Sequence, residues 1–199
     1  VNSFFMVDSV FNLDRADARG FADELIRRGL SVNWTAFFMP RGLNARDVAA
    51  WRESGIEGVE FGVDTLSPRL LEKWGKPFTV QDVEKSARLC AEQDVPYVLY
   101  LLFGGPGETS DTVKETLERA ASLPRAVVYA FQGMRVYPGS RLHQIALNEK
   151  MLDPSHDLLA PFFYFSPGLA RDTLHAELEP FSRQRNWLVA GNGMEQAKK

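Results

Sequence analysis

Short apolar runs alternate with longer stretches of helical periodicity along this chain. Each run is too short for a helix and ends at glycine, proline or polar residues, as buried strands do. Between the runs, apolar residues recur every three or four positions, which indicates amphipathic helices. Strands that alternate with helices are parallel, so we expect an α/β barrel or a doubly wound sheet. The five predicted strands are residues 4–7, 32–38, 58–63, 98–103 and 127–136.

The third predicted strand favours the barrel. Val59, Phe61 and Val63 lie on one face of this strand, whereas Glu60 and Asp64 lie on the other. A carboxylate is costly beneath a helix, but the interior of a barrel accommodates polar groups near the strand ends. The pattern therefore indicates a parallel barrel with a polar lumen.

The fourth predicted strand, Val98–Phe103, continues into a glycine-rich turn, Gly104-Gly105-Pro106-Gly107-Glu108-Thr109. Glycines let backbone groups approach a ligand closely, and the N-terminus of the next helix adds partial positive charge. The spacing matches neither a P-loop nor a dinucleotide fingerprint. We therefore expect a pocket for a nucleoside or a similar flat group. Glu108 is interpreted first as a residue that shapes the turn and second as a general acid.

Composition limits the classes of function. The 199 residues are 45% hydrophobic and 25% charged, which is typical of a single globular domain. A net charge of −3 argues against a dominant nucleic-acid-binding face. No apolar run approaches the ~20 residues of a membrane span, and a single cysteine, Cys90, excludes a disulfide framework. We expect a cytoplasmic protein whose own residues form no multi-cysteine metal site.

Polar side chains gather where the predicted strands end. In parallel α/β folds this edge binds ligands, because the loops there lead into helix N-termini. The alternative is that polar residues simply lie where strands leave a core. The residues concerned are Asp8, Asn12, Arg41, Asp64, Thr65, Gly104 to Glu108, Gln132 and Arg135.

The order of these motifs resembles radical S-adenosylmethionine (radical SAM) enzymes. The similar subgroup is the one often preceded by a cobalamin-binding domain, which includes anaerobic cyclase-like and methylthiotransferase-like enzymes. The resemblance covers residues 1–145 and leaves residues 146–199 as a C-terminal extension with a helix and a flexible tail. The matching segments are Phe4–Asn12, Trp34–Arg41, Glu57–Thr65, Leu101–Thr109 and Tyr137–Ser140.

The resemblance implies a partial (β/α)6 TIM-like barrel, of which this chain shows five strands. It also implies a 4Fe–4S cluster on three cysteines spaced CxxxCxxC and reductive cleavage of SAM to a 5′-deoxyadenosyl radical for hydrogen abstraction or methyl transfer. A reductant such as flavodoxin or ferredoxin, a small-molecule substrate and a candidate role for cobalamin follow from the same likeness. The cysteine loop is absent here. We therefore expect a fragment of such an enzyme, inactive by itself.

The same resemblance assigns residues to cofactor binding. Asp64 stands where the family usually has a glutamate that bonds the cofactor ribose, and it is one methylene shorter. Gly104, Gly105, Gly107 and Glu108 match the backbone segment beside the adenine, with Gly105 in place of a bulky apolar residue.

Two further residues take roles from the family. Asp8 ends the strand near the methionyl end of the cofactor, and Arg135 lies on the last barrel strand, where a basic group meets the cofactor carboxylate or the substrate. No catalytic residue and no metal ligand is assigned.

Two other functions stay open at this point. One is a cofactor-independent βα-barrel lyase or hydrolase that uses Asp64, Glu108 and Arg135 directly. The other is a non-catalytic binding module that keeps the barrel without the chemistry.

Overall fold

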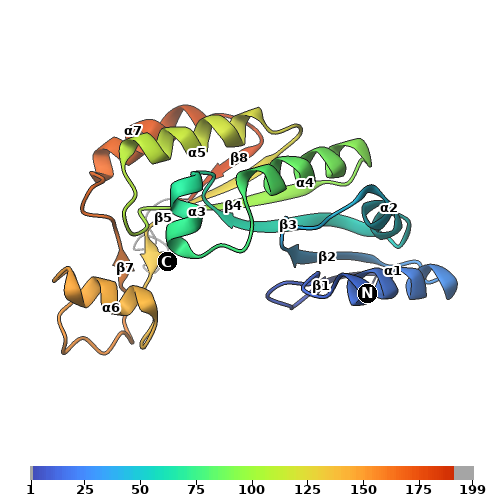
Figure 1. Cartoon of the computed structure of the whole chain (residues 1–199), viewed down its shortest axis with the longest axis horizontal. Helices are drawn as coiled ribbons and strands as arrows, with labels where there is room; N and C mark the ends of the chain where they lie inside the picture. The colour runs from blue at the N-terminus through green and yellow to red at the C-terminus, as the bar shows by residue number, and fades with distance from the viewer. Residues whose placement is uncertain (1, 191–199) are drawn as a thin grey trace.

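A curved sheet of parallel strands forms the centre of the molecule (Figure 1). The computed structural model describes residues 2–190, so the predicted flexible tail lies outside the described residues. Neighbouring strands pair in parallel throughout this sheet, and the α/β fold class is confirmed. The six strands, in spatial order, are β1 (Ser3–Met6), β2 (Asn33–Phe38), β3 (Ile56–Asp64), β4 (Tyr97–Phe103), β5 (Val127–Gln132) and β8 (Trp187–Val189).

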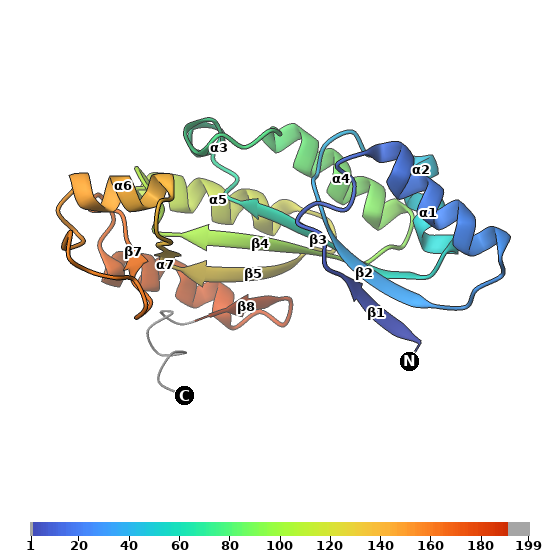
Figure 2. The same cartoon turned by 90° about the horizontal axis from the view of Figure 1, so that it is seen from below.

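Helices cover one face of this sheet and leave the other open. Figure 2 looks onto the open face, where no helix crosses in front of the strands. The covering helices are α1 (Arg15–Arg27), α2 (Ala45–Glu53), α3 (Pro68–Trp74), α4 (Val80–Glu92), α5 (Ser110–Ser122) and α7 (Arg171–Ser182). No helix within residues 2–190 is long and apolar enough to cross a membrane.

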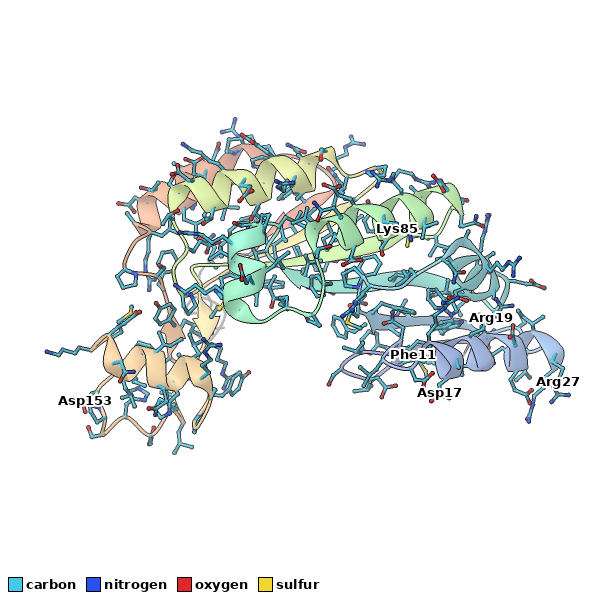
Figure 3. All side chains as sticks on the ribbon, viewed as in Figure 1. Phe11, Asp17, Arg19, Arg27, Lys85 and Asp153 are labelled. Atoms are coloured by element: carbon cyan, nitrogen blue, oxygen red, sulfur yellow. The ribbon has the colours of Figure 1, made fainter. Side chains whose placement is uncertain are left out.

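Strand alternation explains which side chains form the core. Trp34 of β2, Phe61 of β3 and Leu99 of β4 point towards the helices and are fully buried. The residues next to each of them along its own strand point to the open face. Charged side chains such as Arg27 and Lys85 lie on the outside of the molecule (Figure 3). The covered face therefore carries the hydrophobic core, and the open face is free for other contacts.

Three helices begin at polar residues that cap them. Asp14 accepts hydrogen bonds from the first turn of α1, and Asn44 accepts one from the start of α2. Thr79 and Asp82 form a capping box at the start of α4. These local signals fix where each helix begins after the preceding strand.

A smaller unit follows β5 and corrects one prediction. The strand expected over 127–136 ends at Gln132, because Gly133 has φ +80° and donates its N–H to the carbonyl of Phe103. The chain then forms β6 (Met134–Arg135), which pairs antiparallel with β7 (Phe163–Tyr164) in a separate sheet beside α6 (Arg141–Asn148).

The C-terminal part adds a strand that the sequence pattern did not predict. The expected helix is present as α7, which lies beside α5, and β8 then pairs in parallel with β5. β8 has only three residues, too few for a periodic signal. The domain boundary expected at residue 145 stays a prediction.

Candidate functional site

The glycine-rich turn after β4 is folded around a buried carboxylate. Glu108 is fully buried, and its Oε2 accepts the backbone N–H groups of Gly104 and Gly105. Gly104 has φ +93° and Gly107 has φ +78°, a region that glycine adopts without strain. The carboxylate satisfies two N–H groups that no strand or helix partner reaches. The geometry agrees with the interpretation of Glu108 as the residue that shapes the turn.

Burial changes the acidity of this group. Loss of solvent raises the pKa of Glu108 to about 7, although the N–H donors of Gly104 and Gly105 act in the opposite direction. Its other oxygen, Oε1, has no hydrogen-bond partner within the described chain. Glu108 therefore keeps its proton to a higher pH than an exposed glutamate does.

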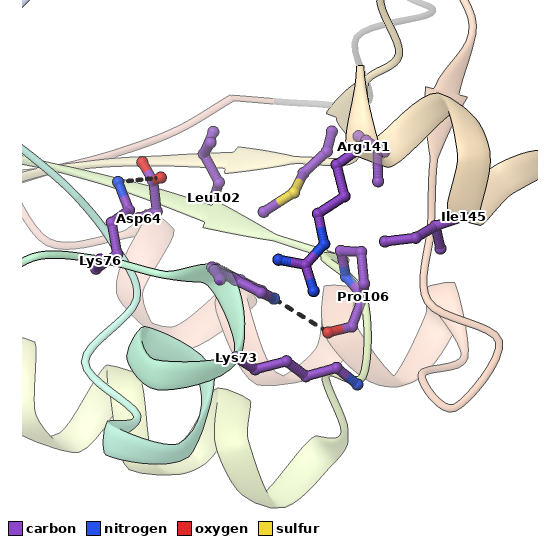
Figure 4. A pocket seen from close by; sticks show the side chains of 10 residues that line it. Asp64, Lys73, Lys76, Leu102, Pro106, Arg141 and Ile145 are labelled. Atoms are coloured by element: carbon purple, nitrogen blue, oxygen red, sulfur yellow. Dashed lines mark hydrogen bonds and ion pairs between the residues drawn. The ribbon is translucent and has the colours of Figure 1, made fainter. Parts of the chain in front are cut away.

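A cavity of about 410 Å³ lies beside this turn, at the carboxyl ends of β3 and β4 and between α3 and α6 (Figure 4). Its volume is within the ~300–1,000 Å³ of small-molecule sites. One wall is apolar, and charged groups stand around it. The lining residues are Asp64, Lys73, Trp74, Lys76, Leu102, Pro106, Met134, Arg141, Leu142 and Ile145.

Asp64 lines this cavity from the end of β3. It has φ +65°, and the register of β3 with β4 shifts before it, so the strand bends as it reaches the cavity. Its Oδ2 lies 2.5 Å from Nζ of Lys76, which also donates to the carbonyl of Gly62 over 3.1 Å. Burial raises the pKa of Asp64, and the nearby Lys76 ammonium partly offsets that rise.

Trp74 joins α3 to the turn. Its indole N–H donates to the carbonyl of Pro106 over 3.0 Å (Figure 4). A Cβ at Gly105 would lie 2.3 Å from the Trp74 ring and 2.6 Å from the methyl group of Met134. Trp74 and Met134 therefore occupy the space that a bulky side chain at position 105 would need, which accounts for the glycine there.

Two cations at the cavity were not predicted as site residues. Lys73 comes from the last turn of α3 and Arg141 from the first residue of α6, and neither has an ion-pair partner among residues 2–190. Figure 4 shows Arg141 reaching into the cavity towards Pro106. No sequence motif marks these residues, because only the tertiary fold brings the two helices together.

The structure separates the other predicted residues from this cavity. Asp8 is exposed and lines a different hollow of about 510 Å³, next to Asp14 and Asp17. Arg135 is exposed, and its guanidinium lies 5.0 Å from the centre of the Tyr137 ring. Of the predicted set, the structure brings Asp64 and the turn together, with Asp8 and Arg135 elsewhere.

A comparison with known families places the chain. Residues 9–120, more than half of the sequence, match the model of the Radical SAM superfamily. The chain belongs to the radical SAM superfamily. This match confirms the resemblance to radical SAM enzymes that the order of the motifs indicates.

Relatives of this radical SAM chain include methyltransferases. It is 29% identical over 147 residues to an uncharacterized methyltransferase, PH0819, of Pyrococcus horikoshii, covering 73% of this chain and 32% of that protein. It is 24% identical over 152 residues to tryptophan 2-C-methyltransferase of Streptomyces laurentii, covering 69% of this chain and 25% of that protein. The chain thus spans a third or less of the length of these curated relatives.

A solved structure supports the same fold. TsrM of Kitasatospora setae, a radical SAM methyltransferase solved with cobalamin and a 4Fe–4S cluster bound, superposes with a TM-score of 0.80 at 22% identity. The match covers 96% of this chain and 46% of that one. The partial-barrel arrangement is therefore that of radical SAM enzymes.

The residues of this chain fit one of the two groups that radical SAM enzymes bind, and do not fit the other. A 4Fe–4S cluster does not fit this chain, because Cys90 is its one cysteine and its buried thiol has a pKa raised to about 12. Among the described residues, no group of three or more histidine, cysteine, aspartate or glutamate side chains is placed to hold a metal. S-adenosylmethionine does fit, since the cavity offers a carboxylate, an apolar wall and free cations.

Proposed function

We propose that this chain binds S-adenosylmethionine in the cavity beside the turn, as part of a radical SAM enzyme of the methyltransferase type. The observation that carries the proposal is the cavity itself. It lies at the strand ends where parallel barrels bind ligands, and it is lined by both Asp64 and the turn residue Pro106.

Each part of the ligand has a matching group. The Asp64 carboxylate would accept hydrogen bonds from the ribose hydroxyls, and the adenine would lie against Leu102, Pro106 and Met134. Arg141 would bind the methionyl carboxylate, since a guanidinium pairs with a carboxylate through two N–H donors. The sulfonium supplies the reactive methyl or adenosyl group when the ligand is bound.

The remaining residues hold this arrangement in place. Glu108 fixes the two N–H groups of the turn from behind, and Trp74 fixes the Pro106 carbonyl. Both contacts join residues of this chain, so the chain itself holds the adenine wall in place. A preformed wall lowers the entropic cost of binding.

The activity of the parent enzyme is a wider proposal. The cluster ligands must come from residues outside these 199, because the chain has one cysteine. Methyl transfer is supported by the names of the relatives, PH0819 and tryptophan 2-C-methyltransferase, and a cobalamin requirement by the TsrM complex. We infer a small-molecule substrate and an external electron donor for the parent.

The lyase or hydrolase alternative is not favoured. It requires Asp64, Glu108 and Arg135 to act on one substrate. Asp64 lines the cavity, Glu108 is buried behind the turn, and Arg135 faces solvent beside Tyr137. These three groups do not share a cavity, so they cannot act together.

Asp64→Asn should weaken binding of S-adenosylmethionine to the 199-residue chain by about tenfold. The amide keeps the size of the side chain but removes a charged acceptor for the ribose, which is worth roughly 1–2 kcal/mol. Isothermal titration calorimetry measures the change.

Asp172→Asn is the matched control, since Asp172 is exposed on α7 and lies outside the cavity lining. It should bind as the unsubstituted chain does. Absence of binding to the unsubstituted chain at millimolar ligand, or equal affinities for it and the Asp64 variant, would refute the proposed site.

The parent activity needs a second experiment. The parent protein, reconstituted anaerobically with iron and sulfide and reduced with dithionite, should consume S-adenosylmethionine and form 5′-deoxyadenosine or a methylated product. A parent sequence without clustered cysteines would contradict the proposal directly.

A further inference from the structure

The open face of the sheet carries an aromatic cluster around one carboxylate. We define this cluster as Phe37 of β2, Glu60 of β3, Tyr100 of β4, and Tyr129 and Phe131 of β5. The open face has no helix over it (Figure 2), and every member of the cluster is half-buried. None of its members lines the cavity beside the turn, which lies further along the same face, at the carboxyl ends of β3 and β4.

The rings of this cluster are packed against one another. The ring centre of Tyr100 lies 5.6 Å from that of Phe37, 5.3 Å from that of Tyr129 and 6.2 Å from that of Phe131. The Tyr129 ring meets it edge-on, and the Phe131 ring is parallel to it. These contacts fix the rings, so their faces form a prearranged surface across β2, β4 and β5.

Glu60 lies beside the rings of Phe37 and Tyr100. The Tyr100 hydroxyl donates to its Oε2 over 2.8 Å, and Phe37 is its partner in the register of β2 with β3. Burial and the Glu60 charge raise the pKa of Tyr100, so its hydroxyl stays protonated and keeps donating.

No cation neutralises this carboxylate within residues 2–190. Lys76, which reaches β3 further along the strand, is bound by Asp64 and by the Gly62 carbonyl. Gly62 follows Glu60 on the same face, and a Cβ added there would meet nothing within 4 Å. An oriented carboxylate beside aromatic rings therefore has open space next to it.

We propose that the aromatic cluster around Glu60 binds an organic cation, namely a substituted ammonium, amidinium or protonated nitrogen heterocycle. Aromatic faces attract such cations through their quadrupoles, and the carboxylate beside them supplies the complementary charge. The inference rests on the proposed function, because it assigns the substrate of that enzyme to this chemical class. In a barrel, this face is the lumen, where a substrate would meet the strand-end cavity.

The test uses choline and its neutral isostere, 3,3-dimethylbutan-1-ol, as probes of the 199-residue chain without S-adenosylmethionine. The two differ in charge and hardly in shape. We expect saturation-transfer NMR titrations to show choline binding at least tenfold more tightly than the alcohol. Glu60→Gln should weaken choline binding about tenfold, and Tyr100→Phe, which keeps the ring but frees the carboxylate, about threefold.

Glu57→Gln is the control for general charge effects. Glu57 lies on the same strand, is exposed and accepts a hydrogen bond from Ser3 instead of lying among the rings. It should bind choline as the unsubstituted chain does.

Equal binding of choline and the alcohol, or equal losses from Glu57→Gln and Glu60→Gln, would overturn the inference, as would no choline binding at all. The result is independent of the strand-end cavity. If choline binds and S-adenosylmethionine does not, the proposed function and the assignment of a substrate fail, while the cation site itself stands.

Discussion

Glu108→Ala should lower the free energy of unfolding by about 3 kcal/mol. The substitution leaves the N–H groups of Gly104 and Gly105 without an acceptor in a region closed to solvent. Each unsatisfied buried donor costs roughly 1–3 kcal/mol, and the loss of the unfavourable buried carboxyl offsets part of that cost. Urea unfolding followed by circular dichroism measures the change.

The same residue should make stability depend on pH. The pKa of Glu108 is about 7 in the folded chain against an ordinary value of 4.5, so the folded state binds the proton more tightly. The contribution of protonated Glu108 to the free energy of unfolding is complete below about pH 4.5 and is lost as the pH rises through about 7. The loss amounts to about 3 kcal/mol, because one pKa unit corresponds to about 1.4 kcal/mol.

Glu108→Gln separates this effect from other titrating groups. Its amide oxygen can accept the N–H groups of Gly104 and Gly105, but it does not ionise. The unfolding free energy of the unsubstituted chain, taken relative to that of this variant, should fall by about 3 kcal/mol as the pH rises from about 4.5 to 7. The exposed Glu118→Gln should leave the pH profile unchanged. A constant difference across that window would show that Glu108 does not titrate there.

The fold was predictable because its signals are local. The strands β1 to β4 and their helices are each encoded by a short apolar run or by a periodic stretch with a capping residue such as Asn44 or Thr79. The break after Gln132 was not predictable in this way, since residues 127–136 were interpreted as one strand and only Gly133 marks its end. β8 is defined by pairing with β5 rather than by its own pattern.

The site residues also differ in whether local signals predict them. Asp64 and the turn were predicted because each follows directly from a strand end, and the parallel sheet brings strand ends together. Lys73, Trp74 and Arg141 were not predicted, because their helices approach the turn only in the folded chain. The sequence shows Gly105 as a departure from the family, and the structure supplies the reason, which is the Trp74 ring.

Gly104→Ala should lower the free energy of unfolding by about 3 kcal/mol and weaken binding of S-adenosylmethionine severalfold. Gly104 has φ +93°, and a Cβ there would lie 2.8 Å from the Phe165 ring. The segment that carries Phe165 is tied to the turn, since the Ser166 N–H donates to the Gly104 carbonyl over 2.8 Å and its hydroxyl to the Glu108 carbonyl over 2.9 Å. Backbone strain and the displaced ring each cost about 1–3 kcal/mol.

Gly42→Ala is the control that isolates the ring contact. Gly42 has φ +74°, but a Cβ there would meet nothing within 4 Å, so its cost should be the backbone strain alone, about 1 kcal/mol. Adding Phe165→Leu to Gly104→Ala should then restore part of the lost stability, because the smaller side chain can move away from the new methyl group. If Gly104→Ala and Gly42→Ala lower the free energy of unfolding by the same amount, the Phe165 ring does not pack closely against the turn at Gly104. The segment after β7 would then play no part in fixing the adenine wall.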